Sequence, residues 1–360
     1  MSAPPEDRPG AVSAVICNYQ GREYLPACLE ALQSCCLAEV IVVDNASTDG
    51  SLQWLREHHP QVRIIELGEN AGPARARNAG FKAATTPWVL SLDNDAVVTP
   101  GMLERLCDAA RKRPDAKVLA PRSVFRSEPD RVHYDAGSVH YAGLISLRNF
   151  YCPLEQARGE DLEEVDVFVS VCVLCDREVL LDLGGYDERY FILFEDLDLS
   201  LRLRQAGHTL LAVENALVHH DAGTPGLSFR EAGRYPAPRV FYHSRNRWLF
   251  LLKTYHWWTL LVCLPGLCVY ECVWLGFAIS KGALGAWMRG KWAVLRSLPV
   301  SLRMRKETQA RRTVGDRSLL VGGPLTVTPA LEQSRAGAGL VAVVDALLRG
   351  VWSLVRPLLR

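Results

Sequence analysis

The sequence predicts an α/β protein with a mostly parallel sheet flanked by helices, followed by a helical C-terminal region that associates with a membrane. Short apolar runs alternate with helical patterns through the N-terminal third, which is typical of parallel strands joined by helices. Two of these runs stop abruptly at acidic residues. The last third combines a long apolar segment with a basic one. We expect residues 1–10 to be a disordered polar leader, 11–250 one α/β domain and 251–360 the membrane-associated region.

The expected elements begin with a buried strand at 11–17 and a helix at 22–34. Further strands are expected at 40–43, 62–67 and 88–92, with helices from residue 51 and at 73–84. Beyond residue 120 the pattern loosens, and we expect a strand near 165–174 and helices near 177–183 and 195–207. Ligands bind at the carboxyl ends of the strands in such sheets. The acids that end the strands at 40–43 and 88–92 therefore mark the expected site.

The formal net charge of +1 conceals an asymmetry along the chain. Residues 1–280 carry a net charge of −9 and residues 281–317 a net charge of +8. An acidic body suits the handling of cations, and a basic segment suits an anionic surface. Because the cations at 281–317 are mixed with Trp and Leu and follow an apolar run, we expect lipid headgroups rather than nucleic acid.

The cysteines and the N-terminus bear on the compartment. Most of the eleven cysteines lie in apolar stretches, and the pair Cys172 and Cys175 has no second pair or histidine near it in the sequence. We expect core thiols in a reducing compartment rather than a zinc or redox site. The N-terminus lacks the charged-then-apolar pattern of a signal peptide. These features predict a body on the cytoplasmic face of the inner membrane.

Residues 257–280 form an apolar run with one charge, Glu271, and are long enough to span a bilayer. Pro265 and Gly266 interrupt the run, and basic residues flank both of its ends, so no orientation is favoured. A single span, a broken hairpin and a helix lying in the interface all fit, and a buried core helix is the alternative. Another apolar helix is expected at 339–359.

Asp93, Asn94 and Asp95 follow the strand at 88–92. Two carboxylates spaced by one residue around a turn can share a hard cation, and Mg²⁺ prefers oxygen ligands. Such a metal offsets the negative charge that grows on a departing phosphate. The alternative is that these acids only form a turn or cap a helix.

Two further polar blocks suit a nucleotide. At its strand end, Asp44 can accept from a ribose hydroxyl or a base N–H, and the helix after Asn45 points its N-terminus at phosphates. Arg75 and Arg77 lie where the helix at 73–84 starts, and arginine suits bidentate contacts with a diphosphate. An ordinary capped turn and solvated surface arginines are the alternatives.

Glu195 and Asp196 form a third acidic cluster, preceded by apolar residues and followed by alternating leucines. Partial desolvation there raises the pKa of a carboxyl towards values useful for a base. A helix N-terminus that carries acids for dipole reasons is the alternative. His219 can complete a metal shell by its imidazole, although a lone histidine is more often structural.

Taken in order, these blocks resemble glycosyltransferase family 2 with the GT-A fold, especially its rhamnosyltransferase-like bacterial members. The resemblance covers residues 11–250 and rests on six blocks in the family's order. They are Asn18-Tyr19, Asp44 to Ser51, Asn70 to Gly80, Asp93-Asn94-Asp95, Gly184 to Glu188, and Phe194 to Leu199.

The resemblance implies inverting transfer of a sugar, with rhamnose as the first expectation, from a nucleotide-diphosphate sugar to a lipid-linked or cell-envelope glycan. It implies Asp196 as the general base and Glu195 as a residue that helps to orient Asp196 or the acceptor. It implies Mg²⁺ or Mn²⁺ at Asp95, Asp93 and His219. The substrate contacts that it implies come from Asn18, Asp44, Asn45, Arg75, Arg77, Asn78, Asp93 and Asn94.

Val171 departs from the resemblance, because relatives often carry a small residue at this wall of the acceptor site. The identity of the acceptor is therefore not carried over from the family.

A sugar nucleotidyltransferase is an alternative function, but such an enzyme would usually have a Gly-rich loop after the first strand. A silent membrane-attached scaffold is another, but it would be expected to have lost Asp95 or Asp196. The enzymatic interpretation requires Asp44, Asp95 and Asp196 to converge in one crevice.

Overall fold

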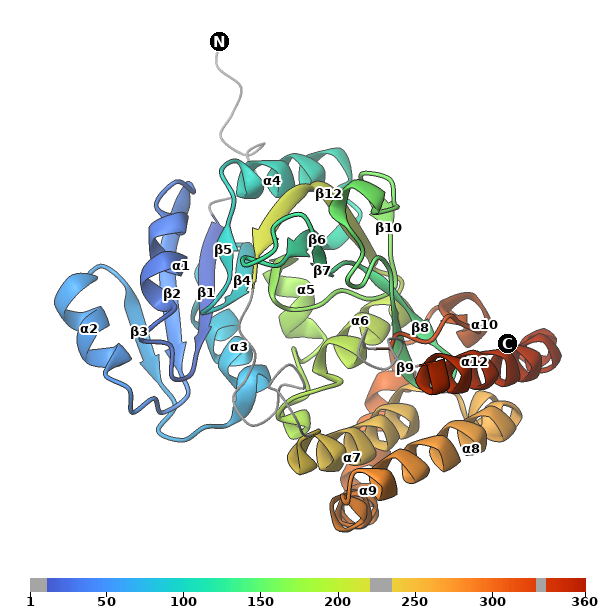
Figure 1. The fold of residues 1–360 in the computed structure, drawn as a ribbon. Coiled ribbons are helices and arrows are strands. Elements are labelled where there is room, and N and C mark those ends of the chain that lie inside the picture. The colour runs from blue at the N-terminus through green and yellow to red at the C-terminus, as the bar shows by residue number, and fades with distance from the viewer. Residues whose placement is uncertain (1–11, 221–234, 328–334) are drawn as a thin grey trace. The chain divides into compact units, whose positions relative to one another are not determined.

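The computed structural model describes residues 12–220, 235–327 and 335–360 (Figure 1). It divides into two compact units that interleave along the chain. The first unit comprises Met1–Ala136, Arg148–Leu199 and His208–Ala222, and the second comprises Gly137–Leu147, Ser200–Gly207 and Gly223–Arg360. The expected leader at 1–10 lies outside the described residues, and the expected boundary after residue 250 stays a prediction.

The first unit is built on one sheet with the strand order β10-β12-β6-β11-β4-β1-β2-β3, to which β5 adds at β12 and β7 at β6. Its strands are β1 (Val12–Asn18), β2 (Leu37–Asp44), β3 (Arg63–Glu66), β4 (Trp88–Asp93), β5 (Val97–Val98), β6 (Ala116–Val124), β7 (Val132–Tyr134), β10 (Glu163–Glu164), β11 (Cys172–Asp176) and β12 (Thr209–His219). The pairs β1–β2, β1–β4, β2–β3 and β6–β12 are parallel, whereas β11 is antiparallel to both of its neighbours. The predicted mostly parallel sheet is confirmed.

Helices cover both faces of this sheet. Alternate residues of a strand point to opposite faces, and every residue of β1 is buried, so both of its faces need a covering helix. Ala14 and Ile16 of β1 share a core cluster with α1, while Val15 meets Gly80 of α3 on the other face. A Cβ at Gly80 would lie 2.2 Å from Val15 Cγ1, so a glycine lets α3 approach the strand closely. The helices that begin in this unit are α1 (Leu25–Leu32), α2 (Ser51–His58), α3 (Gly72–Ala83), α4 (Met102–Lys112), α5 (Arg177–Asp182) and α6 (Glu195–Gln205), with the 3₁₀ turns η2 (Leu154–Gln156) and η3 (Glu188–Tyr190).

The strand expected near 165–174 is shorter and later than the sequence pattern indicates. Val165, Val167 and Phe168 are buried, but the strand itself is β11, at Cys172–Asp176. The backbone N–H of Ser170 donates to the Asp196 carboxylate at 3.2 Å, so it makes a side-chain contact instead of a ladder bond. An apolar run alone therefore overestimates the strand, because burial does not require ladder pairing.

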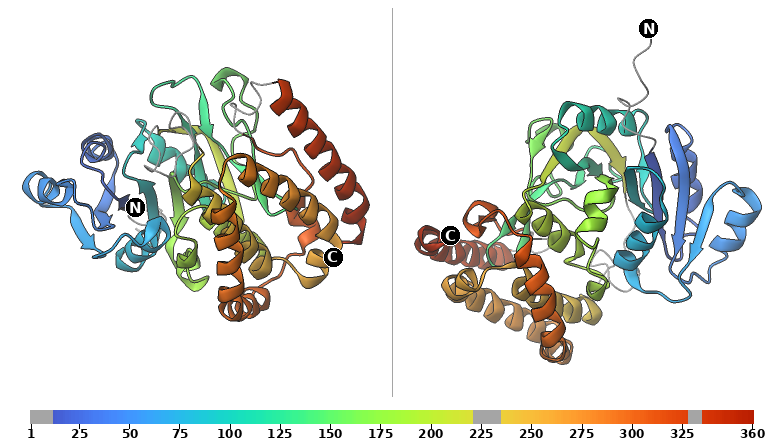
Figure 2. Two further views of the ribbon diagram at one scale, coloured as in Figure 1. Left: turned by 60° about the horizontal axis from the view of Figure 1, so that its bottom comes forward. Right: turned by 180° about the vertical axis from the view of Figure 1, so that it is seen from behind.

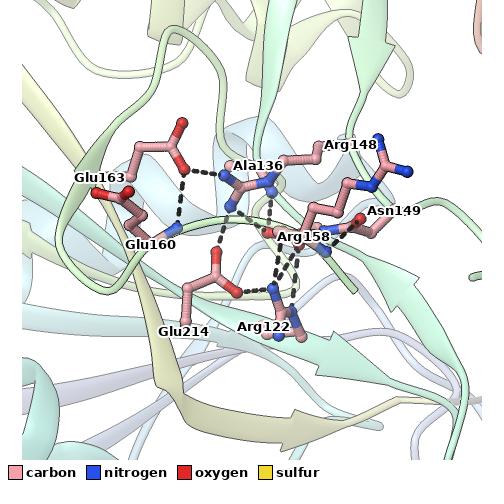
Figure 3. A network of polar contacts seen from close by, with 9 residues as sticks. Arg122, Ala136, Arg148, Asn149, Arg158, Glu160, Glu163 and Glu214 are labelled. Atoms are coloured by element: carbon pink, nitrogen blue, oxygen red, sulfur yellow. Dashed lines mark hydrogen bonds and ion pairs between the residues drawn. The ribbon is translucent and has the colours of Figure 1, made fainter. Parts of the chain in front are cut away.

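An ion-pair network ties the segment after residue 148 to the sheet of the first unit (Figure 3). Arg122 of β6 contacts Asp135 at 3.1 Å and also pairs with Glu214 of β12. Arg148 contacts Asp135 at 3.1 Å and pairs with Glu214 and with Glu163 of β10. The Asp135 and Glu214 side chains are buried, so their charges are matched inside the protein rather than by water.

The second unit combines a small sheet with long helices (Figure 1 and Figure 2). The sheet has the order β13-β8-β9, with β8 at Gly137–His140, β9 at Leu144–Leu147 and β13 at Leu320–Val321. The helical elements are α7 (Ala237–Thr254), α8 (Trp257–Ser280), α9 (Leu284–Ala310), α10 (Asp316–Leu319), α12 (Arg335–Val355) and the 3₁₀ turn η4 (Arg356–Leu358). Residues Trp257–Ser280 and Gly337–Leu358 are each long and apolar enough to cross a membrane. The two helices expected at 257–280 and 339–359 are both present.

Candidate active site

The register of the parallel strands brings the first acidic blocks together. Asn18 at the end of β1 pairs with Asp44 at the end of β2, and Cys17 pairs with Asp93 at the end of β4. The carboxyl ends of these neighbouring strands meet at one sheet edge, which is where ligands bind in such folds. Blocks that are far apart in the sequence therefore become neighbours through strand pairing.

Asp44 is fully buried and its carboxylate is held by short hydrogen bonds. Asn18 Nδ2 and the Ser47 hydroxyl each donate to Asp44 Oδ1 at 2.6 Å, and the Ser47 N–H donates to Asp44 Oδ2 at 2.8 Å. Asn18 Oδ1 in turn accepts from Asn94 Nδ2 at 2.8 Å. The asparagine side chain thus connects the Asp44 block to the turn that carries Asp93 and Asp95.

Two of the proposed substrate-binding asparagines hold the protein's own backbone. Asn45 Oδ1 accepts from the N–H of Ala71 at 3.3 Å. Asn78 Nδ2 donates to Tyr186 O at 2.8 Å, while its Oδ1 accepts from Tyr186 N at 2.8 Å. A Cβ at Gly185 would lie 2.3 Å from Asn78 Oδ1, and the backbone there has φ +65°, so glycine is required at that position. Asn78 therefore fixes the turn that precedes Glu195.

The two arginines of α3 have different surroundings, because residues two apart on a helix do not share a face. Arg75 is exposed and pairs with Glu69 at 2.7 Å. Arg77 is buried, with its guanidinium 2.5 Å from Asp93 Oδ1 and 3.0 Å from Ser170 O. Arg77 is therefore the positive charge inside the acidic cluster, and Arg75 belongs to the surface.

Asp196 lies in the first turn of α6, and Ser170 holds its carboxylate. The Ser170 hydroxyl donates to Asp196 Oδ1, and its N–H donates to Oδ2 at 3.2 Å. Burial raises the pKa of Asp196, and the charge of Arg77 together with the Ser170 hydrogen bonds opposes that rise. The same Ser170 hydroxyl lies 2.5 Å from the Tyr186 hydroxyl. Asp196 is thus an oriented carboxylate with an enhanced affinity for a proton.

Glu195 is more enclosed than Asp196. Only 7% of its surface is exposed, and its Oε2 atom has no hydrogen-bond partner among the described residues. Burial, followed by the neighbouring Asp196 charge, raises the pKa of Glu195 to about 8. The three residues Phe191, Leu193 and Phe194 that precede it have positive φ angles of 63°, 68° and 76°. Strained non-glycine backbone of this kind clusters at functional sites.

Asp93, Asp95 and His220 form a candidate cation site, with one ligand atom from each residue all within 4.8 Å of one another. His220 Nε2 is 3.1 Å from Asp95 Oδ2. From the sequence, His219 is the histidine expected in this shell. The structure brings His220 there instead: His219 is the last residue of β12, and the side chain of the next residue points to the other side of the chain.

Two carboxylates and one imidazole suit Mn²⁺ or Mg²⁺, the imidazole favouring the transition metal. Burial, opposed by Arg77 and reinforced by the Asp95 charge, raises the pKa of Asp93 to about 6. That rise reports like charges held close together, and a bound cation would relieve it. The donor set therefore fits the divalent metal that the sequence analysis expects.

His133 of β7 is a residue that the sequence analysis missed. Its Nδ1 lies 3.0 Å from Nδ1 of His220, and the two rings stack with centroids 4.8 Å apart. If His220 Nδ1 carries the proton, its Nε2 presents a lone pair towards Asp95, which is the tautomer that a metal needs. No sequence signal marks His133, because it lies in the stretch after residue 120 where the pattern loosens.

Comparison with known proteins agrees with this geometry. The family model described as Glycosyl transferase family 2 matches residues 13–184. The N-acetylglucosaminyl-diphospho-decaprenol L-rhamnosyltransferase of Mycobacterium tuberculosis (strain ATCC 25618 / H37Rv) is 32% identical over 241 residues, which is 61% of this chain and 76% of the relative. The pre-mycofactocin glycosyltransferase of the same organism is 32% identical over 172 residues, 46% of this chain and 33% of the relative.

Among solved structures, the crystal structure of GalNAc-T7 with UDP, GalNAc and Mn²⁺ matches with a TM-score of 0.52 at 17% identity. The match covers 69% of this chain and 48% of that chain. At this identity the likeness concerns the fold alone. The fold, the order of the acidic blocks and the rhamnosyltransferase relative are all consistent with one enzyme family.

Proposed function

Because this chain belongs to glycosyl transferase family 2 and has the GT-A fold, we propose that it is an inverting glycosyltransferase that moves one sugar from a nucleotide-diphosphate sugar to a lipid-linked or cell-envelope glycan. The observation that carries the proposal is the convergence of the three acidic blocks in the first unit. Asn18 links Asp44 to the Asp93–Asp95 turn, and Ser170 contacts both Arg77 and Asp196.

The donor half of the site comprises the strand-end residues. Asp44 and Asn18 are held at the sheet edge where the nucleoside would lie, and Asn94 extends this polar wall. Asp93, Asp95 and His220 would hold Mg²⁺ or Mn²⁺, which offsets the negative charge on the departing diphosphate. Arg77 keeps Asp93 ionised beside the other acids, since its guanidinium lies 2.5 Å away. His133 fixes the orientation of the His220 ring.

The acceptor half contains Asp196 and Glu195. The acceptor hydroxyl oxygen attacks the anomeric carbon while the bond from that carbon to the diphosphate oxygen breaks. The hydroxyl proton passes to Asp196, whose raised pKa makes it a more effective base. Attack on the face opposite the leaving group inverts the anomeric configuration without a covalent enzyme intermediate. Glu195 beside it retains its proton up to about pH 8 and orients the acceptor or Asp196.

The substrate classes follow from the first relative and from the second unit. That relative is named for L-rhamnose transfer to N-acetylglucosaminyl-diphospho-decaprenol. We extend to this chain a rhamnosyl donor and a lipid-linked acceptor. Two long apolar helices support an acceptor at a membrane, and we place the enzyme on its cytoplasmic face. Val171 is buried and follows Ser170, whose side chain holds Asp196, and we propose that its bulk narrows the acceptor site.

The experiment is a thermal-shift screen of dTDP, UDP and GDP and their sugars, each with Mn²⁺ or with EDTA. We expect a dTDP-sugar to raise the melting temperature in Mn²⁺ and to lose that effect in EDTA. Transfer of radiolabelled rhamnose to a polyprenyl diphosphate acceptor is then measured with the preferred donor. If no nucleotide sugar stabilises the protein with either addition, the proposal is wrong.

A further inference from the structure

Helix α8 presents an exposed stripe without a charged side chain. Its exposed positions recur at helical spacing along one side. They are Trp257, Trp258, Leu261, Leu264, Pro265, Cys268, Cys272, Gly276, Ile279 and Ser280. Leu261 is 61% exposed and Ile279 56% exposed, so the stripe is accessible over the whole length of the helix. Contiguous apolar surface of this kind marks an interaction site.

Helix α12 runs antiparallel beside α8 and adds a second stripe. Trp258 Nε1 near the start of α8 donates to Leu358 O near the end of the chain at 2.8 Å. Both helices pack on Tyr141: its hydroxyl donates to Leu348 O of α12 at 2.9 Å, and a Cβ on Gly266 of α8 would lie 2.3 Å from that hydroxyl. Because both buried faces contact one side chain, both exposed faces point away from it. The exposed apolar residues of this second stripe are Leu340, Val343, Leu347, Leu354 and Leu358.

Glu271 lies on the flank of α8, between the exposed stripe and the face that packs inside the second unit. Arg247 of α7 contacts Glu271 at 2.9 Å, and Lys291 of α9 contacts it at 2.5 Å. The indole N–H groups of Trp248 and Trp287 donate to the same carboxylate at 2.8 and 3.0 Å. If α8 crossed the bilayer, these charged partners on α7 and α9 would have to enter the hydrocarbon with it. Charged side chains are costly there.

Helix α9 places positive charge beside an apolar stripe of its own. Arg289, Arg296 and Arg303 are exposed at intervals of seven residues and therefore lie along one side of the helix. Trp292 and Leu295 are also exposed, 56% and 60% respectively. Basic helices that expose Trp and Leu suit an interface of anionic lipids.

We infer that the second unit docks on an anionic phospholipid surface with α8 and α12 lying in the plane of the membrane rather than across it. The paired stripes enter the apolar boundary of one leaflet, the α9 arginines contact the headgroups, and the Glu271 cluster stays on the protein side. The inference rests on the proposed membrane-bound acceptor for its purpose, but its geometry depends on the second unit alone. It selects one of the arrangements that the sequence leaves open.

The experiment measures binding of the full chain to vesicles of phosphatidylglycerol and phosphatidylcholine, and to vesicles of phosphatidylcholine alone, without nucleotide or acceptor. We expect binding to the anionic vesicles that weakens as salt rises, and release of the protein by alkaline carbonate. Leu347→Asp should weaken vesicle binding by about tenfold or more, since it places a charge on the exposed apolar stripe that would enter the lipid. Arg296→Gln should weaken binding to anionic vesicles by roughly fivefold, the effect of one well-placed cation.

Gln53→Asp on α2 and Arg105→Gln on α4 are the matched controls, because both positions are exposed on the first unit. Neither should change vesicle binding. Retention after carbonate, with equal binding to both vesicle types, would show a spanning helix and overturn the inference; so would an absence of binding. The thermal shift by nucleotide sugar is measured without lipid, so failure here and failure of the proposed function give separate results.

Discussion

Around Asp135 and Glu214 two guanidinium groups, Arg122 and Arg148, match the buried carboxylates, whereas among the described residues near Asp93 the one guanidinium of Arg77 is set against four carboxylates. The four are Asp93, Asp95, Glu195 and Asp196. Both clusters lie in the first unit and both remove charge from water, so burial alone does not distinguish them. The difference lies in the balance of charge. A matched cluster is complete by itself, while the unmatched one attracts a cation and raises the pKa of Asp93 and Glu195.

The largest expected effect comes from the unmatched cluster. Asp196→Asn removes the proton acceptor while keeping the side-chain volume, so transfer should fall on the order of 10³-fold. Donor binding, read by thermal shift, should persist. Asp135→Asn is the corresponding change in the matched network and should leave turnover per folded molecule unchanged. Undiminished turnover in Asp196→Asn would remove its assignment as the base.

The next effect concerns stability in the matched network. Arg122→Met leaves Asp135 and Glu214 short of a partner in a buried place, so the free energy of unfolding should drop by about 3–5 kcal/mol. Urea denaturation measures it. Arg105→Met, at an exposed position on α4, should change it by less than about 0.5 kcal/mol. If Arg122→Met lost turnover but kept normal stability, the Asp135–Glu214 network would belong to the active site, and the contrast between the two clusters would be wrong.

A smaller effect should follow the addition of a cation to the unmatched cluster. Mn²⁺ at about one hundred times its dissociation constant should stabilise the protein by roughly 2.7 kcal/mol, because it binds the folded state alone. Calorimetric melting with and without EDTA measures it. Asp95→Asn should abolish the gain, and Asp108→Asn at an exposed position should not. Equal stabilisation of both variants would show that Mn²⁺ binds elsewhere.

The smallest expected effect, at most about 1.4 kcal/mol for each pH unit, is a pH dependence of the stability of the EDTA-treated protein. Folding raises the pKa of Glu195 from 4.5 to about 8, so the folded state holds a proton that the unfolded state has lost between these values. The contribution of Glu195 to stability is therefore present at low pH and declines as pH rises towards 8. Glu195→Gln should flatten this part of the profile, measured by chemical denaturation at pH 5 to 8.5. Parallel profiles for the two proteins would contradict the raised pKa.

Much of this picture could be predicted from the sequence, because strands that alternate with helices form a regular parallel sheet whose strands end at one edge. The apolar runs that end at Asp44 and Asp93 are the two strands that flank β1, so both acids reach the same edge of the sheet. Three features could not be predicted. Arg77 and Arg75 look equivalent in sequence, and only packing separates the buried one from the exposed one. His220 replaces His219 because strand direction, not composition, decides which side chain points inward.

The third feature is the matched network itself, together with His133. Arg122, Asp135 and Arg148 come from a stretch without clear periodicity, where short strands and turns follow one another. Long-range contacts decide which of these charges meet, and a single sequence gives no signal for such pairings. The same stretch supplies His133, which lies beside the candidate metal ligand His220 for the same reason.

Ser170 joins the two halves of the reaction in a rigid way. Its hydroxyl and N–H hold Asp196, while its carbonyl oxygen accepts from Arg77, which grips Asp93. One residue thus sets the spacing between Asp196, the proposed proton acceptor, and Asp93 on the proposed donor side. If the hydroxyl of an acceptor lies too far from the donor-side acids, a shift of Asp196 alone cannot bring it into position, because Ser170 contacts Asp196 and Arg77 together. Selectivity for acceptor length would then come from this fixed distance between Asp196 and Asp93. An enzyme that accepts a broader range of acceptors would require a change in the loop that carries Ser170.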